Sequence, residues 1–285
     1  MSLIPSNFFK SIIAVSYQPP KNGKWESHAT GFFYGSFLNK HFKDWKAYDV
    51  YLVTNRHVFE KKDGSKHSRV YLSFNSHGDL NPAGYGDLEL LDGSGEPTWS
   101  ASKDVDVAVL RIDLEMLESK KIDFMYFQDD EHAATLKELE DEGFFEGEEV
   151  HILGYPGPTK ESARNYPVLR HGVIARIGDT FTGRSKTFLI DALITSGNSG
   201  GPVIAKPSAF HVSNTAGVKG SYLIGIVCGH LQNYKPTFDQ FGKETKVEYK
   251  ENIGLGVVWP IDEIDKLIAE HQGKYGRPKD SKPSA

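Results

Sequence analysis

Short apolar segments separated by polar turns follow one another along the first 113 residues of the chain. Segments such as 50–53 and 107–110 are too short for a core helix and are rich in β-branched residues, so they are predicted to be buried strands. The pattern as a whole predicts six strands, at Ser11–Ser16, Ala29–Tyr34, Tyr48–Thr54, Val70–Phe74, Leu88–Leu91 and Asp106–Ile112.

A second group of six apolar segments begins at residue 149. These predicted strands are Glu149–Leu153, Gly172–Ile177, Thr187–Ile190, Pro202–Ile204, Tyr222–Val227 and Gly254–Val258. Ten of the residues from 129 to 149 are Asp or Glu, and the apolar spacing at 133–140 predicts a short amphipathic helix there. We expect the acidic residues to form a solvated face. After Pro260, apolar residues at 261, 264, 267 and 268 predict an amphipathic helix.

The chain is therefore expected to consist of two strand-rich units joined by a linker. The expected boundaries are 8–128 for the first unit, 129–148 for the acidic linker, 149–260 for the second unit, 261–272 for the C-terminal helix and 273–285 for a disordered tail. The 28 glycines and 14 prolines imply many turns, which favours an all-β protein.

Composition excludes several classes of function. With 39% hydrophobic and 25% charged residues the chain is an ordinary globular sequence, and its net charge of −5 without a long basic block argues against binding nucleic acid or an anionic membrane. No apolar run approaches the roughly 18 residues that span a bilayer. No export signal is visible at the N-terminus, so a cytoplasmic location is expected.

The single cysteine and the histidines suggest neither a disulfide nor a metal site. Cys228 has no partner within the chain, and it lies in an apolar segment without basic neighbours that would activate a thiol. A buried structural cysteine is the favoured interpretation. Because the 11 histidines form no His-x-x-x-His pair or Cys/His cluster, we expect no metal and no cofactor.

The residues that could carry chemistry are a serine, a histidine and an aspartate. Ser199 lies in Gly197-Asn198-Ser199-Gly200-Gly201, where the glycines permit a tight turn whose amides at 197 and 199 could stabilise an oxyanion. A serine hydroxyl needs a base oriented by a carboxylate. His57 follows an apolar strand, and Asp106 opens another, with Asp104 as an exposed competitor.

Taken alone, these segments leave other functions open. A Gly/Asn/Ser cluster is also an ordinary turn. The segment also fits the G-x-S-x-G elbow of α/β-hydrolases, but that motif requires a helix after the serine, and here a strand bounded by prolines follows. A catalytically silent module that binds peptides, or a regulatory protease with one dedicated target, would have the same residues.

The segments together resemble the trypsin-like serine protease superfamily, most closely the HtrA/Deg protease domain. Besides the three catalytic segments, the resemblance rests on Gly147–Gly157, His171–Gly178, Leu223–Val227 and Ile253–Ile261, which fall in the family's order. It covers most of residues 28–265. It implies a chymotrypsin-like fold of two six-stranded antiparallel β-barrels with a C-terminal helix, a Ser-His-Asp triad, and a serine endopeptidase acting on protein or peptide substrates through an acyl-enzyme.

The resemblance also suggests a specificity pocket. Its base would be Leu193, six residues before the nucleophile, which offers no carboxylate for a basic substrate side chain. The expected substrate-binding residues are Leu193, Thr195, Cys228, Gly229, His230, Gly254 and Gly256. A small or apolar residue before the scissile bond (P1) is predicted, with His230 as a possible modifier.

Three departures from the family pattern refine this expectation. Asn198, part of the expected oxyanion-hole segment, replaces the aspartate that pairs with a newly cut N-terminus in zymogen-type relatives, so we expect no such activation. We expect no PDZ domain after the helix. Loops at 61–68, 75–102 and 231–251 are longer than in the compact family pattern and are expected to surround the cleft.

Overall fold

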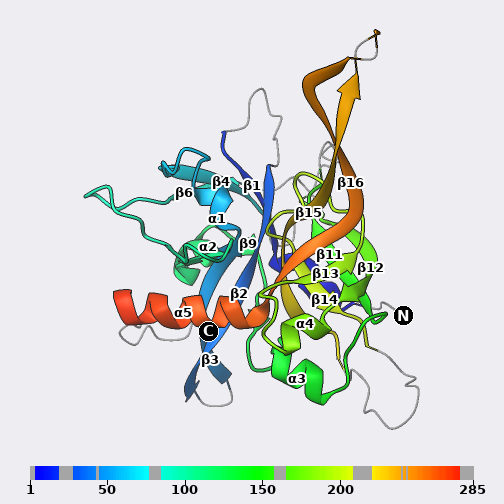
Figure 1. Cartoon of the computed structure of the whole chain (residues 1–285). Coiled ribbons are helices and arrows are strands. Elements are labelled where there is room, and N and C mark those ends of the chain that lie inside the picture. Colours follow the sequence, from blue (N-terminus) through cyan, green and yellow to red (C-terminus); the bar gives the residue numbers. More distant parts are fainter. Residues whose placement is uncertain are drawn as a thin grey trace.

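Two curled sheets form the body of the protein and lie side by side (Figure 1). The computed structural model describes residues 4–18, 28–42, 45–76, 85–156, 165–207, 220–238, 240–241 and 243–276. Most of the expected tail 273–285 and part of the expected loop 75–102 lie outside these residues. None of the described helices combines the length and the apolar character that crossing a membrane requires.

The N-terminal sheet has eight strands in the order β6-β4-β1-β2-β3-β8-β7, with β10 pairing parallel to β2. Its strands are β1 (Ile12–Ser16), β2 (Ala29–Phe42), β3 (Trp45–Thr54), β4 (Arg69–Ser73), β6 (Tyr85–Glu89), β7 (Ser100–Ala101), β8 (Ala108–Arg111) and β10 (Phe127–Gln128). Two-residue strands β5 (Asn75–Ser76) and β9 (Ile122–Asp123) form a separate ladder. Short helices η1 (Ser6–Ser11), α1 (Arg56–Phe59) and α2 (Leu114–Ser119) flank the sheet.

The C-terminal sheet is a closed barrel in the order β11-β12-β13-β16-β15-β14. Its strands are β11 (Glu149–Gly154), β12 (Val168–Arg176), β13 (Phe188–Asp191), β14 (Pro202–Ala205), β15 (Leu223–Phe238) and β16 (Glu244–Pro260). Helices α3 (Leu136–Asp141) and α4 (Gly178–Phe181) lie beside it. The expected all-β, chymotrypsin-like class is confirmed, although the N-terminal sheet has more strands than six and is a curled sheet rather than a closed barrel within the described residues.

Apolar runs in the central strands are continuous because these strands are covered on both faces. In β3, Val50 and Leu52 join the core of the N-terminal sheet, whereas Tyr51 and Val53 join a second apolar layer that also contains Leu153 of β11. A third cluster fills the C-terminal barrel. Burial of one such large side chain contributes roughly 1.5–3 kcal/mol, so the layer shared by both sheets contributes much of the free energy that keeps them together.

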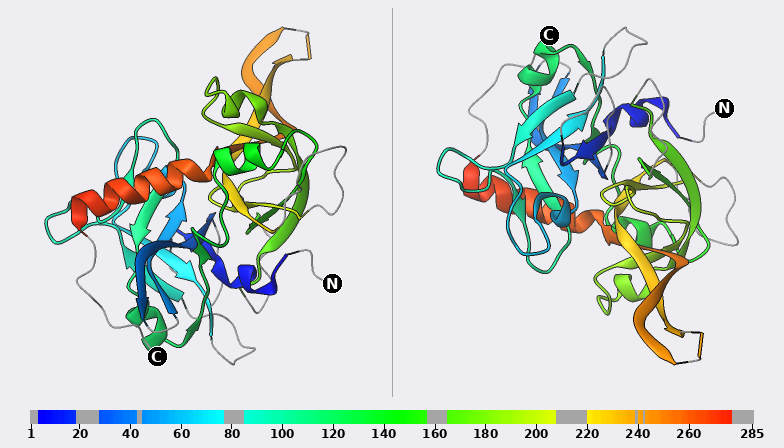
Figure 2. Two further views of the ribbon diagram at one scale, coloured as in Figure 1. Left: turned by 90° about the horizontal axis from the view of Figure 1, so that it is seen from below. Right: turned by 90° about the horizontal axis from the view of Figure 1, so that it is seen from above.

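Helix α5 (Ile261–Tyr275) lies across the junction of the two sheets (Figure 2). It contacts β7 and β8 of one sheet and β15 and β16 of the other. The predicted apolar positions 261, 264, 267 and 268 are all buried in the shared layer. The helix continues three residues beyond the predicted end at 272.

Acidic side chains of the linker are bonded to the N-terminal sheet instead of being merely solvated. Asp129 accepts hydrogen bonds from the Phe37 amide at 3.0 Å, and Asp130 accepts one from the Tyr48 hydroxyl at 2.8 Å. The predicted helix is α3, whose first turn is closed by a capping box between Thr135 and Glu138. The bonds of Asp129 and Asp130 use part of the negative charge to hold the linker against the N-terminal sheet.

The two longest strands, β15 and β16, continue beyond the barrel as a two-stranded ribbon (Figure 1). This ribbon contains the expected long loop 231–251. Tyr234 is 55% exposed on it, and the Lys250 ammonium lies 5.4 Å from the centre of its ring.

One partly buried carboxylate links α5 to the N-terminal sheet. Asp265 accepts a hydrogen bond of 2.7 Å from the hydroxyl of the buried Tyr34. Burial raises the pKa of Asp265 to about 6; the Tyr34 bond opposes this shift, and the nearby charges of Asp129, Asp262 and Glu138 add to it.

The charged form of Asp265 therefore opposes folding, and its protonation should stabilise the protein. Because the folded pKa lies above the unfolded value, the native state binds this proton more tightly, and the unfolding free energy should rise as pH falls from above 6 to about 4. Over this pH range the unfolding free energy of the wild-type protein should rise by roughly 2–3 kcal/mol more than that of Asp265→Asn. Urea unfolding of both proteins at several pH values measures the difference. Parallel pH profiles of the two proteins would show that folding does not raise the pKa of Asp265.

Candidate active site

His57 and Asp106 meet at the edge of the N-terminal sheet. β3 ends at Thr54, Asn55 follows, and His57 is the second residue of α1. Its Nδ1 lies 2.7 Å from Asp106 Oδ2, and its backbone amide donates to Asp106 Oδ1 at 3.1 Å. Both carboxylate oxygens are thus engaged by one residue, an arrangement that fixes the imidazole plane and leaves Nε2 free to act on another group.

The loop before β8 places Asp106, and not Asp104, beside His57. Val105 and Val107 are buried on either side, so the aspartate between them is held at the surface of the core. The Asn55 side chain donates to the Asp106 carbonyl at 2.7 Å. Asp104 is exposed, and its amide donates to Ser102 Oγ at 3.3 Å. The structure therefore brings the expected carboxylate, and not its competitor, to the histidine.

Ser199 comes from the other sheet, in the turn before β14. Gly197 and Gly200 have φ values of +93° and +85°, a region that disfavours side chains, which explains the glycines around the serine. Within the described residues, neither the Gly197 amide nor the Ser199 amide has an acceptor, and no hydrogen bond joins the Ser199 hydroxyl to the His57 ring. The turn therefore has two amides, at 197 and 199, without a hydrogen-bond acceptor among the described residues.

The turn is tied to the N-terminal sheet through β2. The Thr30 amide donates to the Ser199 carbonyl at 2.9 Å, and the Thr30 hydroxyl donates to the Gly197 carbonyl at 2.6 Å. Thr54 in turn donates to the Thr30 carbonyl at 2.7 Å, three residues before His57. These bonds bring the serine turn next to the strand end that carries the histidine. No sequence pattern pointed to Thr30 or Thr54, because the contacts join distant parts of the chain.

Asn198 is fully buried within the turn. Its Oδ1 accepts hydrogen bonds of 3.2 Å from both the amide and the hydroxyl of Thr195, and its backbone amide donates to the Thr195 carbonyl at 3.0 Å. Thr195, expected to bind substrate, is therefore also a structural partner of the nucleophile segment.

The expected pocket residues lie on strands beside this turn. Cys228, Gly229 and His230 follow Val227 on β15, and the Val227 carbonyl accepts from the Gly200 amide at 2.8 Å. His230 pairs with Gly256 on β16. Gly254 adopts a φ of +84°. Together these residues continue the surface that begins at the serine.

Leu193 does not form the floor of an enclosed pocket, because its side chain is 58% exposed. The neighbouring Ile194 is buried, and a Cβ at Gly256 would lie 2.7 Å from its Cγ1. The Asn252 side chain donates to the Ile194 carbonyl at 2.6 Å and holds this segment against β16. Ile194 belongs to the core of the C-terminal barrel, and its contact with Asn252 was not indicated by the sequence, since only the folded chain brings the two residues together.

Cys228 is a protonated thiol at neutral pH. Burial raises its pKa to about 12, and the negative charge of Asp106 adds to the effect. Its Sγ contacts the Val257 carbonyl at 3.4 Å. A thiolate nucleophile is thus excluded at this position.

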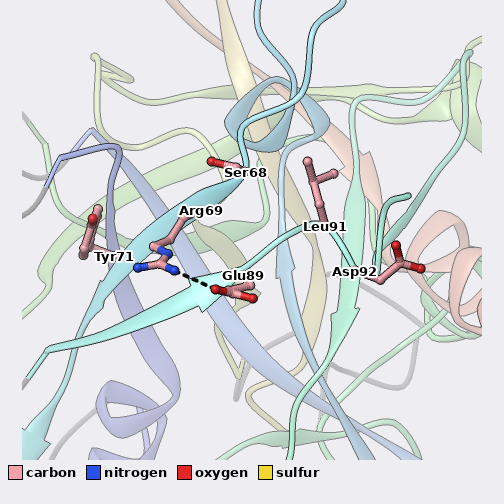
Figure 3. A pocket seen from close by; sticks show the side chains of 6 residues that line it. All are labelled: Ser68, Arg69, Tyr71, Glu89, Leu91 and Asp92. Atoms are coloured by element: carbon pink, nitrogen blue, oxygen red, sulfur yellow. Dashed lines mark hydrogen bonds and ion pairs between the residues drawn. The ribbon is translucent and has the colours of Figure 1, made fainter. Parts of the chain in front are cut away.

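Other clusters in the described part of the chain do not form a competing site. No group of three His, Cys, Asp or Glu side chains there is arranged to hold a metal ion. A recess on β4 and β6 is lined by Ser68, Arg69, Tyr71, Glu89, Leu91 and Asp92 (Figure 3). Arg69 in this recess is already paired with Glu89 and Asp87. The recess contains no member of the Ser199, His57 and Asp106 set.

Packing at Gly200 gives a direct test of the contact between the sheets. A Cβ there would lie 1.9 Å from the Thr30 carbonyl oxygen and 2.6 Å from Thr54 Oγ1. Gly95 has the same φ of +85° but nothing within 4 Å of its would-be Cβ. Gly95→Ala should therefore lower the free energy of unfolding only through backbone strain, by about 1–2 kcal/mol. Gly200→Ala should lower it by about 3 kcal/mol or more. Equal losses in chemical denaturation would contradict the tight approach of β2 to the turn.

Comparison with known proteins agrees with this geometry. No curated protein shows significant sequence similarity to the chain. The family model described as trypsin-like peptidase domain matches residues 29–207, which include β2, His57, Asp106 and the Ser199 turn. The chain therefore belongs to the family of trypsin-like peptidases.

Proposed function

We propose that this protein is an active serine endopeptidase that hydrolyses peptide bonds of protein or peptide substrates through an acyl-enzyme. The observation that carries the proposal is the double contact between His57 and Asp106 beside a serine turn with two unoccupied amides. Family membership supports a protease in general, and this geometry supports the specific chemistry.

In the proposed mechanism, His57 Nε2 removes the proton of the Ser199 hydroxyl as its oxygen attacks the substrate carbonyl. Asp106 holds the proton on Nδ1 and stabilises the imidazolium that forms. The amides of Gly197 and Ser199 receive the developing oxyanion. His57 then gives its proton to the leaving amine, and a water molecule, activated by the same base, hydrolyses the acyl-enzyme.

Substrate selection follows from the apolar surroundings of the turn. Among the residues expected to bind substrate, Leu193, Cys228 and Gly256 are apolar or small, and Cys228 stays protonated, so these three offer no carboxylate to a basic side chain. His230 lies at the rim, where Gln232 contacts its Nε2 at 3.2 Å. We expect this surface to favour small or apolar P1 residues.

The triad is tested by reaction with a fluorophosphonate probe and by cleavage of fluorescein-labelled casein. Ser199→Ala should abolish labelling, and His57→Ala should lower activity by about 10⁴-fold or more, with the double variant little worse than either single one. His171→Ala, which removes an exposed histidine paired with Glu149, should retain wild-type activity. A wild-type protein that neither labels nor cleaves would instead favour a silent peptide-binding module.

Asp106 and Asp104 give a matched pair of variants that tests the carboxylate of the proposed triad. Asp106→Asn should lower the rate by about 10⁴-fold, the size of loss found in the general triad template, because an amide favours the wrong imidazole tautomer. Asp104→Asn should leave the rate unchanged. Reversed outcomes would assign the role to Asp104.

The pocket is tested with a peptide library that varies only the P1 residue. Small or apolar residues should give the highest kcat/KM. Arginine or lysine as the best P1 residue would contradict the proposed apolar pocket, even in a protein whose triad is active.

A further inference from the structure

The peptide planes of the nucleophile turn are held in different ways. The 198–199 plane is fixed because the Asn198 carbonyl accepts from the Gly201 amide at 2.9 Å. The 199–200 plane is fixed on both sides, by the Thr30 amide on the Ser199 carbonyl at 2.9 Å and by the bond from the Gly200 amide to Val227 at 2.8 Å. The Ser199 amide therefore has a determined direction.

The Gly197 amide is less constrained. It belongs to the 196–197 plane, which no hydrogen bond holds within the described residues. Its direction depends on rotation about Gly197, whose φ of +93° lies in a region that glycine adopts readily. Two neighbouring planes set this direction: the 195–196 plane, whose Thr195 carbonyl accepts from the Asn198 amide at 3.0 Å, and the 197–198 plane.

That plane is fixed at one end by the bond from the Asn198 amide to the Thr195 carbonyl at 3.0 Å. Its other end, the Gly197 carbonyl, is held by the Thr30 hydroxyl at 2.6 Å. We propose that Thr30 is a positioning residue of the oxyanion hole, whose hydroxyl holds the Gly197 carbonyl and thereby aims the Gly197 amide at the reacting oxygen.

The donor and acceptor roles of the Thr30 hydroxyl are settled by its surroundings. The Tyr155 amide donates to Thr30 Oγ1 at 3.0 Å, so the single hydroxyl proton is free for the Gly197 carbonyl. Thr30 is fully buried, and a Cβ at Gly154 would lie 2.9 Å from its Oγ1, so little space remains for another rotamer. The hydroxyl is thus a rigid, oriented donor.

Thr30 also joins the two halves of the site. It lies on β2 of the N-terminal sheet, and its carbonyl accepts from Thr54, whose strand leads to His57. Through this residue the sheet that carries the base also orients an amide of the turn that carries the nucleophile. The inference rests on the proposed peptidase function and deepens it.

Thr30→Val and Thr54→Val form a matched pair. Both threonines are fully buried, and their hydroxyls donate to backbone carbonyls at 2.6 and 2.7 Å, but only Thr30 bonds to Gly197. The readout is the reaction with a fluorophosphonate, whose phosphonyl oxygen would occupy the oxyanion position. Saturation kinetics separate its rate constant, kinact, from its binding constant, KI.

Thr30→Val should lower kinact by about 10²–10³-fold, the loss typical of one oxyanion donor, while KI changes by less than about threefold. Thr30→Ser keeps the hydroxyl, so its kinact should stay within about tenfold of wild type. The kinact of Thr54→Val should also stay within about tenfold of wild type. Thermal unfolding checks that each variant folds. If the valine variants do not fold, Thr30→Ala and Thr54→Ala give the same comparison without placing a methyl group against a carbonyl.

Equal loss of kinact in the Thr30 and Thr54 variants would overturn the proposal, because the effect would then be structural. Failure of Thr30→Ser to restore kinact would do the same, because the hydroxyl would not be the active feature. A wild-type protein that does not react contradicts the peptidase function itself, and the proposal about Thr30 falls with it.

Discussion

The apolar layer shared by the two sheets is the feature on which the rest of the structure depends. Residues from β2, β3, β8 and η1 on one side and from β11, β14, β15 and β16 on the other pack in one cluster, with α5 across it. His57 and Asp106 belong to the first sheet, and Ser199 belongs to the second. A site assembled in this way exists only while the layer is intact, so its apolar side chains contribute to chemistry without contacting a substrate.

The polar contacts at the junction set the geometry, whereas the apolar layer supplies the stability. Hydrophobic burial is not directional, and two sheets could slide over each other by a fraction of a strand spacing with little loss. Buried hydrogen bonds do not allow this, because a displaced donor would be left unpaired at a cost of roughly 1–3 kcal/mol. Thr30, with bonds to Ser199, Gly197 and Tyr155, is therefore well suited to fix the register of the two sheets.

The sequence predicted those parts of the fold that leave a periodic or local signal. The central strands were visible because burial on both faces makes them continuously apolar, and α5 was visible from its spacing. Asp106 could be preferred over Asp104 because it adjoins a buried strand. The two-residue strands β5, β7 and β9 are too short to show a period, and the polar ribbon of β15 and β16 reads as a loop because it buries little.

The contacts that complete the site could not be predicted, because they join residues far apart in the chain. The bond from Thr30 to Gly197 spans 167 positions, and nothing in the local sequence of either residue indicates the other. The exposure of Leu193 has a related cause, since it is the neighbouring Ile194 that packs into the core of the C-terminal barrel. A motif can therefore indicate the proposed nucleophile, but the orientation of the amides around it depends on how one sheet packs on the other. In the mechanism that we propose, a residue that orients such an amide, Thr30, lies far from Ser199 in sequence and on the opposite sheet.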